Sequence, residues 1–116
     1  MKSVKVILAP KPADVYHNFI NKASDSKQDV VLLKAFLQKV ELLKENVHYW
    51  QPIAKKLIPA EYKIKYGITN LFRVELLLFW RMLYTLTGGS SNIEIIVLVL
   101  DITDHKEYDK KFGYKK

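Results

Sequence analysis

The sequence predicts an α+β domain in which an N-terminal strand is followed by a helical hairpin packed on a mainly antiparallel sheet, in the order β-α-α-β-β-β. Three observations predict this class. Apolar residues alternate at the start of the chain, two segments then have helical periodicity, and a late segment is apolar on both alternating sets. With 116 residues, 49% of them hydrophobic, residues 1–116 are expected to form a single domain.

The first half of the chain predicts one strand and two helices. Residues 3–9 alternate and are followed by Pro10, which predicts a short strand. From residue 13 the apolar period becomes helical, and Ser26 with Asp29 resembles a capping box that begins a second helix over residues 27–46. The faces expected to be buried consist of Tyr16, Phe19, Ile20 and Ala23 in the first helix and of Leu33, Phe36, Leu37, Val40 and Leu43 in the second.

The second half predicts three or four strands. Residues 47–61 contain two prolines and predict a loop with one helical turn, whereas residues 62–66 alternate and predict a strand that ends at Gly67. Residues 70–77 and 79–86 predict two further strands, and residues 87–92 predict a turn. Residues 93–102 are apolar on both alternating sets, so we expect this strand in the middle of the sheet with both faces covered. Residues 103–116 are a polar tail.

Composition excludes several function classes. The absence of cysteine excludes disulfide scaffolds, thiolate zinc sites and cysteine nucleophiles. His17, His48 and His105 belong to no metal-ligand motif, and the sequence has no phosphate-cradling glycine loop, dinucleotide fingerprint or serine elbow. We therefore expect neither a metal nor a cofactor. No apolar run reaches the ~18 residues needed to cross a bilayer, and the N-terminus does not resemble a signal peptide, so the expected location is cytoplasmic with no membrane partner.

The charge of the chain points to an anionic partner. The net charge is +7, and the two arginines, Arg73 and Arg81, stand in a stretch rich in leucine and aromatic residues. A guanidinium group offers a planar fork of donors that suits phosphate, although each could instead pair a carboxylate such as Glu75. A two-residue turn near residues 77–78 would put the arginines on opposite faces of a hairpin, whereas a bulge or a displaced turn would put them on the same face.

This set of basic and aromatic residues suits RNA cleavage without metal. Attack of the ribose 2′-hydroxyl on the adjacent phosphate needs a base, cations and an acid, and arginines supply the cations. His105 could transfer a proton, and a lysine could act as the base if neighbouring cations lower its pKa. Lys63 and Lys65 are expected on one face of their strand, and Tyr108 could stack on an unpaired base. Alternatively, His105 is a local hydrogen-bonding residue and Tyr108 fixes the tail to the core.

Four motifs follow one another in the second half: Tyr62-Lys63-Ile64-Lys65, Leu71-Phe72-Arg73-Val74, Phe79-Trp80-Arg81-Met82-Leu83-Tyr84 and His105-Lys106-Glu107-Tyr108, the last after an apolar strand. This pattern resembles the RelE/ParE toxin superfamily, and the resemblance is specific from about residue 62 onward. It implies two N-terminal helices on a curved antiparallel sheet. For the RelE branch it also implies a metal-independent mRNA endonuclease that acts on the ribosome and is neutralised by a cognate antitoxin.

The resemblance also implies roles for individual residues. Arg81 matches the sheet arginine that binds the scissile phosphate, and Arg73, or alternatively Lys65, matches the basic residue of the preceding strand. His105 or Lys106 stands where many members carry a C-terminal catalytic arginine or histidine, and Tyr108 matches the tyrosine that stacks on the substrate. The chain departs from the pattern because no arginine follows Arg81 and because acidic residues stand near the proposed site, namely Asp101, Asp104, Glu107 and Asp109.

The expected partners are mRNA, the ribosome and an antitoxin. The lysines expected to contact the RNA backbone are Lys55, Lys56, Lys63, Lys65 and Lys106. An antitoxin is expected to cover apolar surface and the basic groove with an amphipathic helix or strand, and residues 77–79 are either such partner-facing surface or core. The ParE branch has a similar fold but inhibits gyrase without a catalytic set. The alternative is therefore a non-catalytic protein that acts by binding a protein partner, or an inert remnant.

Overall fold

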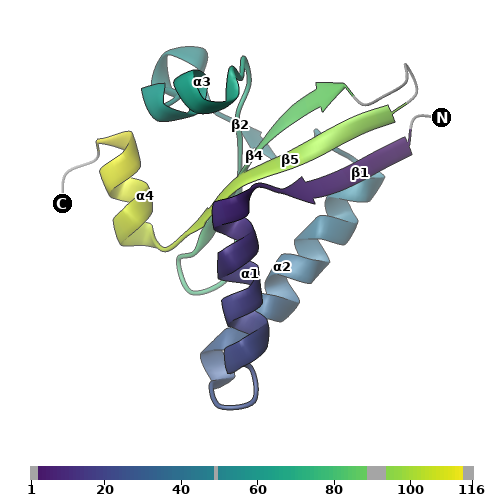
Figure 1. Ribbon diagram of the computed structural model, residues 1–116, viewed down its shortest axis with the longest axis vertical. Helices are drawn as coiled ribbons and strands as arrows, with labels where there is room; N and C mark the ends of the chain where they lie inside the picture. Colours follow the sequence, from purple (N-terminus) through teal and green to yellow (C-terminus); the bar gives the residue numbers. More distant parts are fainter. Residues whose placement is uncertain (1–2, 49, 89–93, 114–116) are drawn as a thin grey trace.

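The structure is a computed structural model that describes residues 3–48, 50–88 and 94–113 (Figure 1). These residues form a mixed five-stranded sheet of order β1-β5-β4-β3-β2, in which β1 runs parallel to β5 and all other neighbours are antiparallel. The strands are β1 (Ser3–Leu8), β2 (Gln51–Pro52), β3 (Phe72–Glu75), β4 (Arg81–Gly88) and β5 (Glu94–Thr103). The helices are α1 (Pro10–Lys22), α2 (Lys27–Glu45), α3 (Ala60–Tyr66) and α4 (His105–Phe112), with a 3₁₀ turn, η1 (Lys55–Leu57). The predicted α+β class is confirmed.

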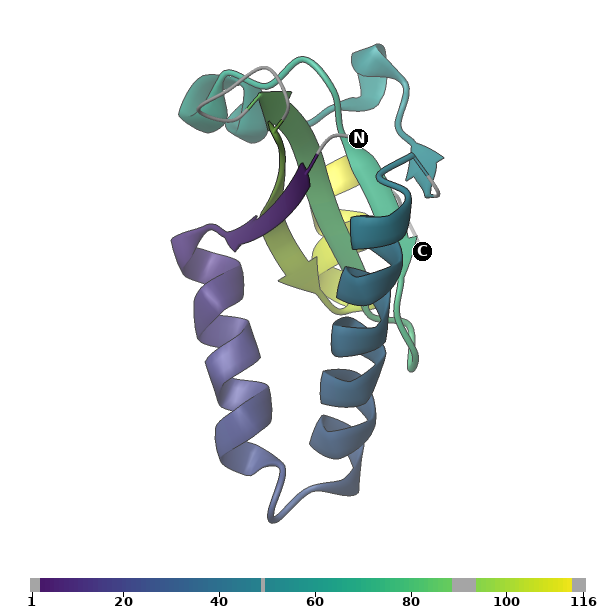
Figure 2. The same ribbon diagram turned by 90° about the vertical axis from the view of Figure 1, so that its right-hand side faces the viewer.

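The helices α1 and α2 form the predicted hairpin and extend beyond the end of the sheet (Figure 2). Ser26 caps α2 as predicted, because its hydroxyl accepts a hydrogen bond from the amide of Asp29 at 3.3 Å. The buried face of α2 is turned from the predicted stripe. Leu32 and Ala35 are buried, whereas Leu37 is exposed. The residues of α2 that face the sheet are therefore shifted by one position toward the N-terminus from those that the apolar period predicts.

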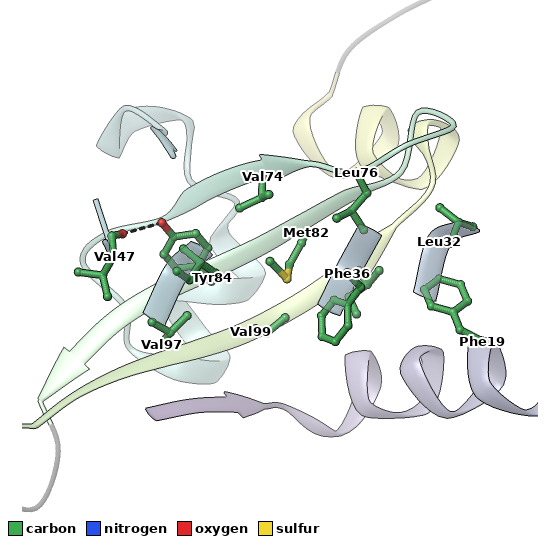
Figure 3. Packing of buried hydrophobic residues seen from close by; sticks show 12 residues of the cluster. Phe19, Leu32, Phe36, Val47, Val74, Leu76, Met82, Tyr84, Val97 and Val99 are labelled. Carbon is green, nitrogen blue, oxygen red and sulfur yellow. Dashed lines mark hydrogen bonds between the residues drawn. The ribbon is translucent and has the colours of Figure 1, made fainter. Parts of the chain in front are cut away.

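The main core lies between this hairpin and the sheet (Figure 3). Phe36 of α2 and Met82 of β4 belong to it, and the fully buried Tyr84 donates a hydrogen bond from its hydroxyl to the carbonyl oxygen of Val47 at 2.8 Å. Val97 and Val99 of β5 complete this side. The prediction that this strand lies within the sheet is confirmed, since β5 stands between β1 and β4.

A second core lies on the opposite face of the sheet, because successive side chains along a strand point to opposite faces. The segments η1, α3 and α4 cover this face, and the residues buried there are Ile58, Tyr62, Leu71, Leu83, Leu100 and Tyr108. The C-terminal segment is therefore not simply a polar tail, since its helix α4 packs on the sheet. Among the described residues, no helix combines the length and the apolar character that crossing a bilayer requires.

The prediction of a strand over residues 62–66 is wrong, because this segment is the helix α3. Tyr62 is buried and Tyr66 half-buried one helical turn later, whereas Ile64 between them is 84% exposed. Pro59 precedes the helix, and Gly67 ends it in the left-handed conformation with φ of 62°. Five alternating residues are too few to distinguish the two periods. The predicted turn at residues 87–92 lies mostly outside the described residues.

The connection between β3 and β4 has an unusual backbone. Leu78 and Phe79 have φ values of 59° and 64°, in the left-handed region. The amide of Leu76 donates to the carbonyl of Trp80 at 2.8 Å and so closes the connection. A residue with a Cβ in this region costs about 1–2 kcal/mol, and Leu78 and Phe79 are both largely exposed. The loop therefore holds backbone strain that burial of its side chains does not offset.

We predict that Leu78→Gly does not destabilise the protein and raises its free energy of unfolding by up to about 1 kcal/mol, because glycine relieves the left-handed strain. Leu77 is also exposed but is not in the left-handed region. Leu77→Gly should therefore lower the free energy of unfolding by about 0.5–1 kcal/mol. Urea denaturation of both variants measures the difference, and an equal loss in both would contradict the assignment of strain to Leu78.

Candidate active site

Arg73 and Arg81 lie on the same face of the sheet. In the register of β3 and β4, Glu75 faces Arg81 and Arg73 faces Leu83. Side chains two residues apart along β3 share a face, so both arginines point to the face that carries α4. The two-residue turn considered from the sequence is therefore wrong, because three residues, 77–79, connect Leu76 and Trp80, whose backbones are hydrogen-bonded. The arginines share a face, as expected from the alternative with a bulge or a displaced turn. Sequence periodicity could not decide this, because the strained residues of the loop have no turn signature.

Tyr108 of α4 contacts both guanidinium groups. Nη1 of Arg73 donates a hydrogen bond to the Tyr108 hydroxyl at 3.2 Å, and the Arg81 guanidinium carbon lies 4.6 Å from the centre of its ring. The Arg73 guanidinium carbon is 5.8 Å from the same ring centre, and the ring of Phe112 stacks on it at 4.5 Å. The Tyr108 side chain is only 2% exposed. In this structure Tyr108 positions the arginines by cation–π contacts and does not offer its ring to solvent.

Arg81 retains hydrogen-bonding capacity. Its Nη1 donates to the carbonyl oxygen of Phe79 at 3.2 Å, but its buried Nε has no hydrogen-bond partner among the described residues. The same holds for the buried hydroxyl of Thr103, which faces Arg81 across β4 and β5. Buried polar atoms are usually paired, so a polar ligand or a water here would be stabilised by both groups.

The structure pairs neither arginine with a carboxylate of the described residues. Among the described residues, no carboxylate oxygen lies within 4.0 Å of either guanidinium group. Glu75 faces Arg81 in the register but forms no ion pair with it, so the alternative in which each arginine serves such a pair is not realised. Two unpaired positive charges therefore share one surface.

His105 lies next to this cluster at the first position of α4. Asp104 caps the helix by accepting a hydrogen bond from the amide of Glu107 at 2.9 Å, and this fixes where α4 begins. The His105 ring meets the ring of Phe79 edge-on, with 5.9 Å between their centres. Because the carbonyl of Phe79 accepts from Arg81, a single residue connects the imidazole to the guanidinium group.

A pocket of about 130 Å³ opens beside Arg73 and Tyr108. Arg73 also donates through Nη2 to the side-chain oxygen of Gln51, which belongs to the short strand β2. Sequence reasoning missed Gln51, because a two-residue strand carries no periodic signal. The exposed Lys55 and Lys56 belong to η1, next to this pocket. The residues that line it are Gln51, Pro52, Ile53, Ala54, Leu57, Arg73, Tyr108 and Phe112.

The remaining predicted lysines lie on helices and not on the strands that carry the arginines. Lys63 and Lys65 are exposed on α3, so the expectation that they share the face of a strand is wrong, and residues two apart on a helix do not face the same side. The ammonium group of Lys65 lies 5.4 Å from the ring centre of Tyr66. Lys106 is exposed on α4, directly after His105. The structure thus brings Arg73, Arg81 and Tyr108 together with His105 beside them, but not Lys65.

Most of the acidic residues near the cluster form hydrogen bonds or ion pairs with other residues of the fold. Asp101 is 2% exposed and accepts a hydrogen bond from the Tyr62 hydroxyl at 2.7 Å, and its oxygens lie 3.6 Å from Nζ of Lys11 and 3.3 Å from Nζ of Lys111. Glu107 pairs with Lys11 at 3.2 Å. Together with Asp104, which caps α4, three of the four acids are bound within the fold. Their charges therefore repel a phosphate less than the sequence suggests.

The contacts of Asp101 change the pKa values of its partners. Burial, followed by the hydrogen bond and the charge of Asp101, raises the pKa of Tyr62 above its ordinary value. Burial alone acts to lower the pKa of Lys111, but its hydrogen bonds and charge interactions with Glu61 and Asp101 outweigh burial and raise it. In the folded chain both groups keep their protons in alkaline solution.

We predict that the free energy of unfolding falls as the pH rises above about 10, because the unfolded chain then loses protons that folded Tyr62 and Lys111 retain. Tyr62→Phe should make this decline shallower. At pH 7 it should cost about 1–3 kcal/mol, because the buried carboxylate of Asp101 loses a donor. Tyr66→Phe is the matched control with little expected effect. Urea denaturation from pH 7 to 11 measures both, and an identical pH dependence in the two variants would contradict the assignment.

No family model matches the chain, and no curated protein or solved structure matches it. Within residues 3–48, 50–88 and 94–113, no group of three or more histidine, aspartate or glutamate residues is arranged to hold a metal ion. The residues that the structure brings together at the candidate site are Arg73, Arg81, Tyr108 and His105. The resemblance to the RelE/ParE superfamily stays a prediction that rests on the four motifs.

Proposed function

We propose that this protein is the toxin of a type II toxin–antitoxin pair, a RelE-like endoribonuclease that cleaves mRNA on the ribosome without a metal. The observation that carries the proposal is the pair of arginines, which share one face of the sheet, are positioned by Tyr108 and lack a carboxylate partner among the described residues. Two such guanidinium groups on a chain of net charge +7 are suited to a phosphodiester.

In the proposed reaction the ribose 2′-oxygen attacks the adjacent phosphorus, and the bond from phosphorus to the 5′-oxygen of the next nucleotide breaks. The products are a 2′,3′-cyclic phosphate and a free 5′-hydroxyl. Arg81 and Arg73 stabilise the negative charge that gathers on the phosphate oxygens. His105 gives a proton to the leaving oxygen. Its ring contacts Phe79, whose carbonyl oxygen accepts a hydrogen bond from Arg81. The proton of the 2′-hydroxyl passes to solvent water.

The proposed partners use other surfaces of the same protein. The exposed Lys55 and Lys56 on η1 border the pocket at Arg73, and Lys63 and Lys65 are exposed on α3. These lysines supply contacts to the RNA backbone, whose strength falls with salt. A cognate antitoxin neutralises the protein by covering this basic surface and the apolar side chains beside it.

We predict that Arg81→Ala lowers mRNA cleavage at least about 100-fold, because removal of one preorganised donor from a developing charge has effects of that order. Arg81→Lys should retain part of the activity, since it keeps the charge but loses the planar fork. Lys34→Ala, at an exposed position of α2, removes one charge away from the site and should leave cleavage unchanged. Primer extension on mRNA from a translating extract measures cleavage, and circular dichroism checks that each variant folds.

Two outcomes would contradict the nuclease proposal. Full cleavage by Arg81→Ala would exclude the role of Arg81. Growth arrest by the wild-type protein with intact mRNA would favour the alternative, a non-catalytic toxin that binds a protein such as gyrase. Expression that neither harms the host nor cuts mRNA would exclude both toxin functions.

A further inference from the structure

We infer that Phe79 is the stacking platform for an unpaired RNA base next to the phosphate that Arg81 binds. The inference rests on the proposed function and adds a binding residue that the sequence motifs did not assign. The sequence predicted that Tyr108 stacks on the base. The inference assigns this role instead to an aromatic residue in the connection between β3 and β4. Three features of Phe79 carry it: its exposure, its strained backbone and its position beside Arg81.

The ring of Phe79 is directed to solvent by a rigid loop. It is 74% exposed, although its backbone has φ of 64°, which is costly for a residue with a Cβ. Trp80, the next residue, meets Phe19 of α1 edge-on at 5.3 Å, and its carbonyl accepts the hydrogen bond from Leu76. The loop is thus fixed to the core on one side and presents Phe79 on the other. The fold itself gains little from an aromatic residue placed in this way.

The position of Phe79 favours a nucleotide as the ligand. Its carbonyl oxygen is 3.2 Å from Nη1 of Arg81, and its ring meets the imidazole of His105. A cation that binds a phosphate and an exposed aromatic ring beside it are the two parts with which proteins bind single-stranded nucleic acid. Tyr108 cannot supply the second part in this conformation, because its ring is buried against Phe112 and the arginines.

The loop also carries apolar side chains that could bind something else. Leu77 and Leu78 are 57% and 50% exposed, and a surface cavity of about 360 Å³ is formed by residues 75–81. An apolar surface for a protein partner would depend on the leucines as much as on Phe79. A base platform depends on the aromatic ring alone, because every base has a π-face that stacks on it. The two surfaces are therefore distinguished by comparing substitutions within the loop.

The test is fluorescence anisotropy with a labelled, 2′-O-methylated single-stranded oligonucleotide, which cannot be cleaved, and a duplex of the same sequence. Phe79→Ala should weaken binding of the single strand about 5- to 140-fold, the effect of losing one stacked base. Duplex binding should not change, because its bases are already stacked. Phe79→Trp should retain affinity, and Leu77→Ala is the matched control. The salt dependence should stay as in wild type for Phe79→Ala and become weaker for Arg81→Ala.

The outcomes separate this inference from the function on which it rests. If Arg81→Ala loses affinity for the single strand and Phe79→Ala does not, the stacking role is overturned and the proposed function stands. If the wild-type protein binds neither oligonucleotide, the proposed function fails together with the inference. If Leu77→Ala weakens binding as much as Phe79→Ala, or if Phe79→Ala only reduces self-association in sedimentation, the loop is an apolar interaction surface and the inference is overturned.

Discussion

One buried carboxylate connects most of the C-terminal half to the rest of the protein. Asp101 lies within β5, an inner strand of the sheet, and its partners come from three helices: Lys11 of α1, Tyr62 of α3 and Lys111 of α4. Removing a carboxylate from water costs several kcal/mol unless donors replace the solvent. These helices must therefore stand where their donors reach Asp101. Asp101 thus links α4, which also packs on the sheet through Tyr108, to α1 and α3.

The same sheet serves two purposes because its faces differ in chemistry. One face of β4 presents Met82 and Tyr84 to the helical hairpin, and the other presents Arg81 and Leu83 to α4. Packing of the first face is apolar and tight, and it fixes the strands. The second face has a smaller core, so charged groups can remain near its edge. The arginines are consequently held on a rigid support without being buried in the main core.

The sequence was a good guide wherever a segment had a long period or a specific local signal. The apolar residues of β5 and the cap at Ser26 led to correct elements. The two arginines of the chain, Arg73 and Arg81, stand in one stretch rich in leucine and aromatic residues, and this indicated the candidate site. Shorter segments were not predictable, because the five residues of Tyr62–Tyr66 fit two periods equally well. The pairing of the arginines depended on Leu78 and Phe79 adopting a conformation that leucine and phenylalanine rarely adopt. Gln51 and the burial of Tyr108 arise from tertiary packing, which no local pattern encodes.

The parallel pairing of β1 with β5 has a consequence for biosynthesis. Among the described residues, β1 has one neighbour in the sheet, and this neighbour is β5, the strand that comes latest in the chain. The chain between β1 and β5 forms a long loop, and closing it costs conformational entropy before the pairing of the two strands stabilises the fold. The sheet is therefore completed late, when residues 94–103 are free to fold. During translation α1 and α2 emerge before β3, β4 and β5, the strands that complete the core beneath them. The sheet that carries Arg73 and Arg81 is therefore completed only after β5 has been synthesised.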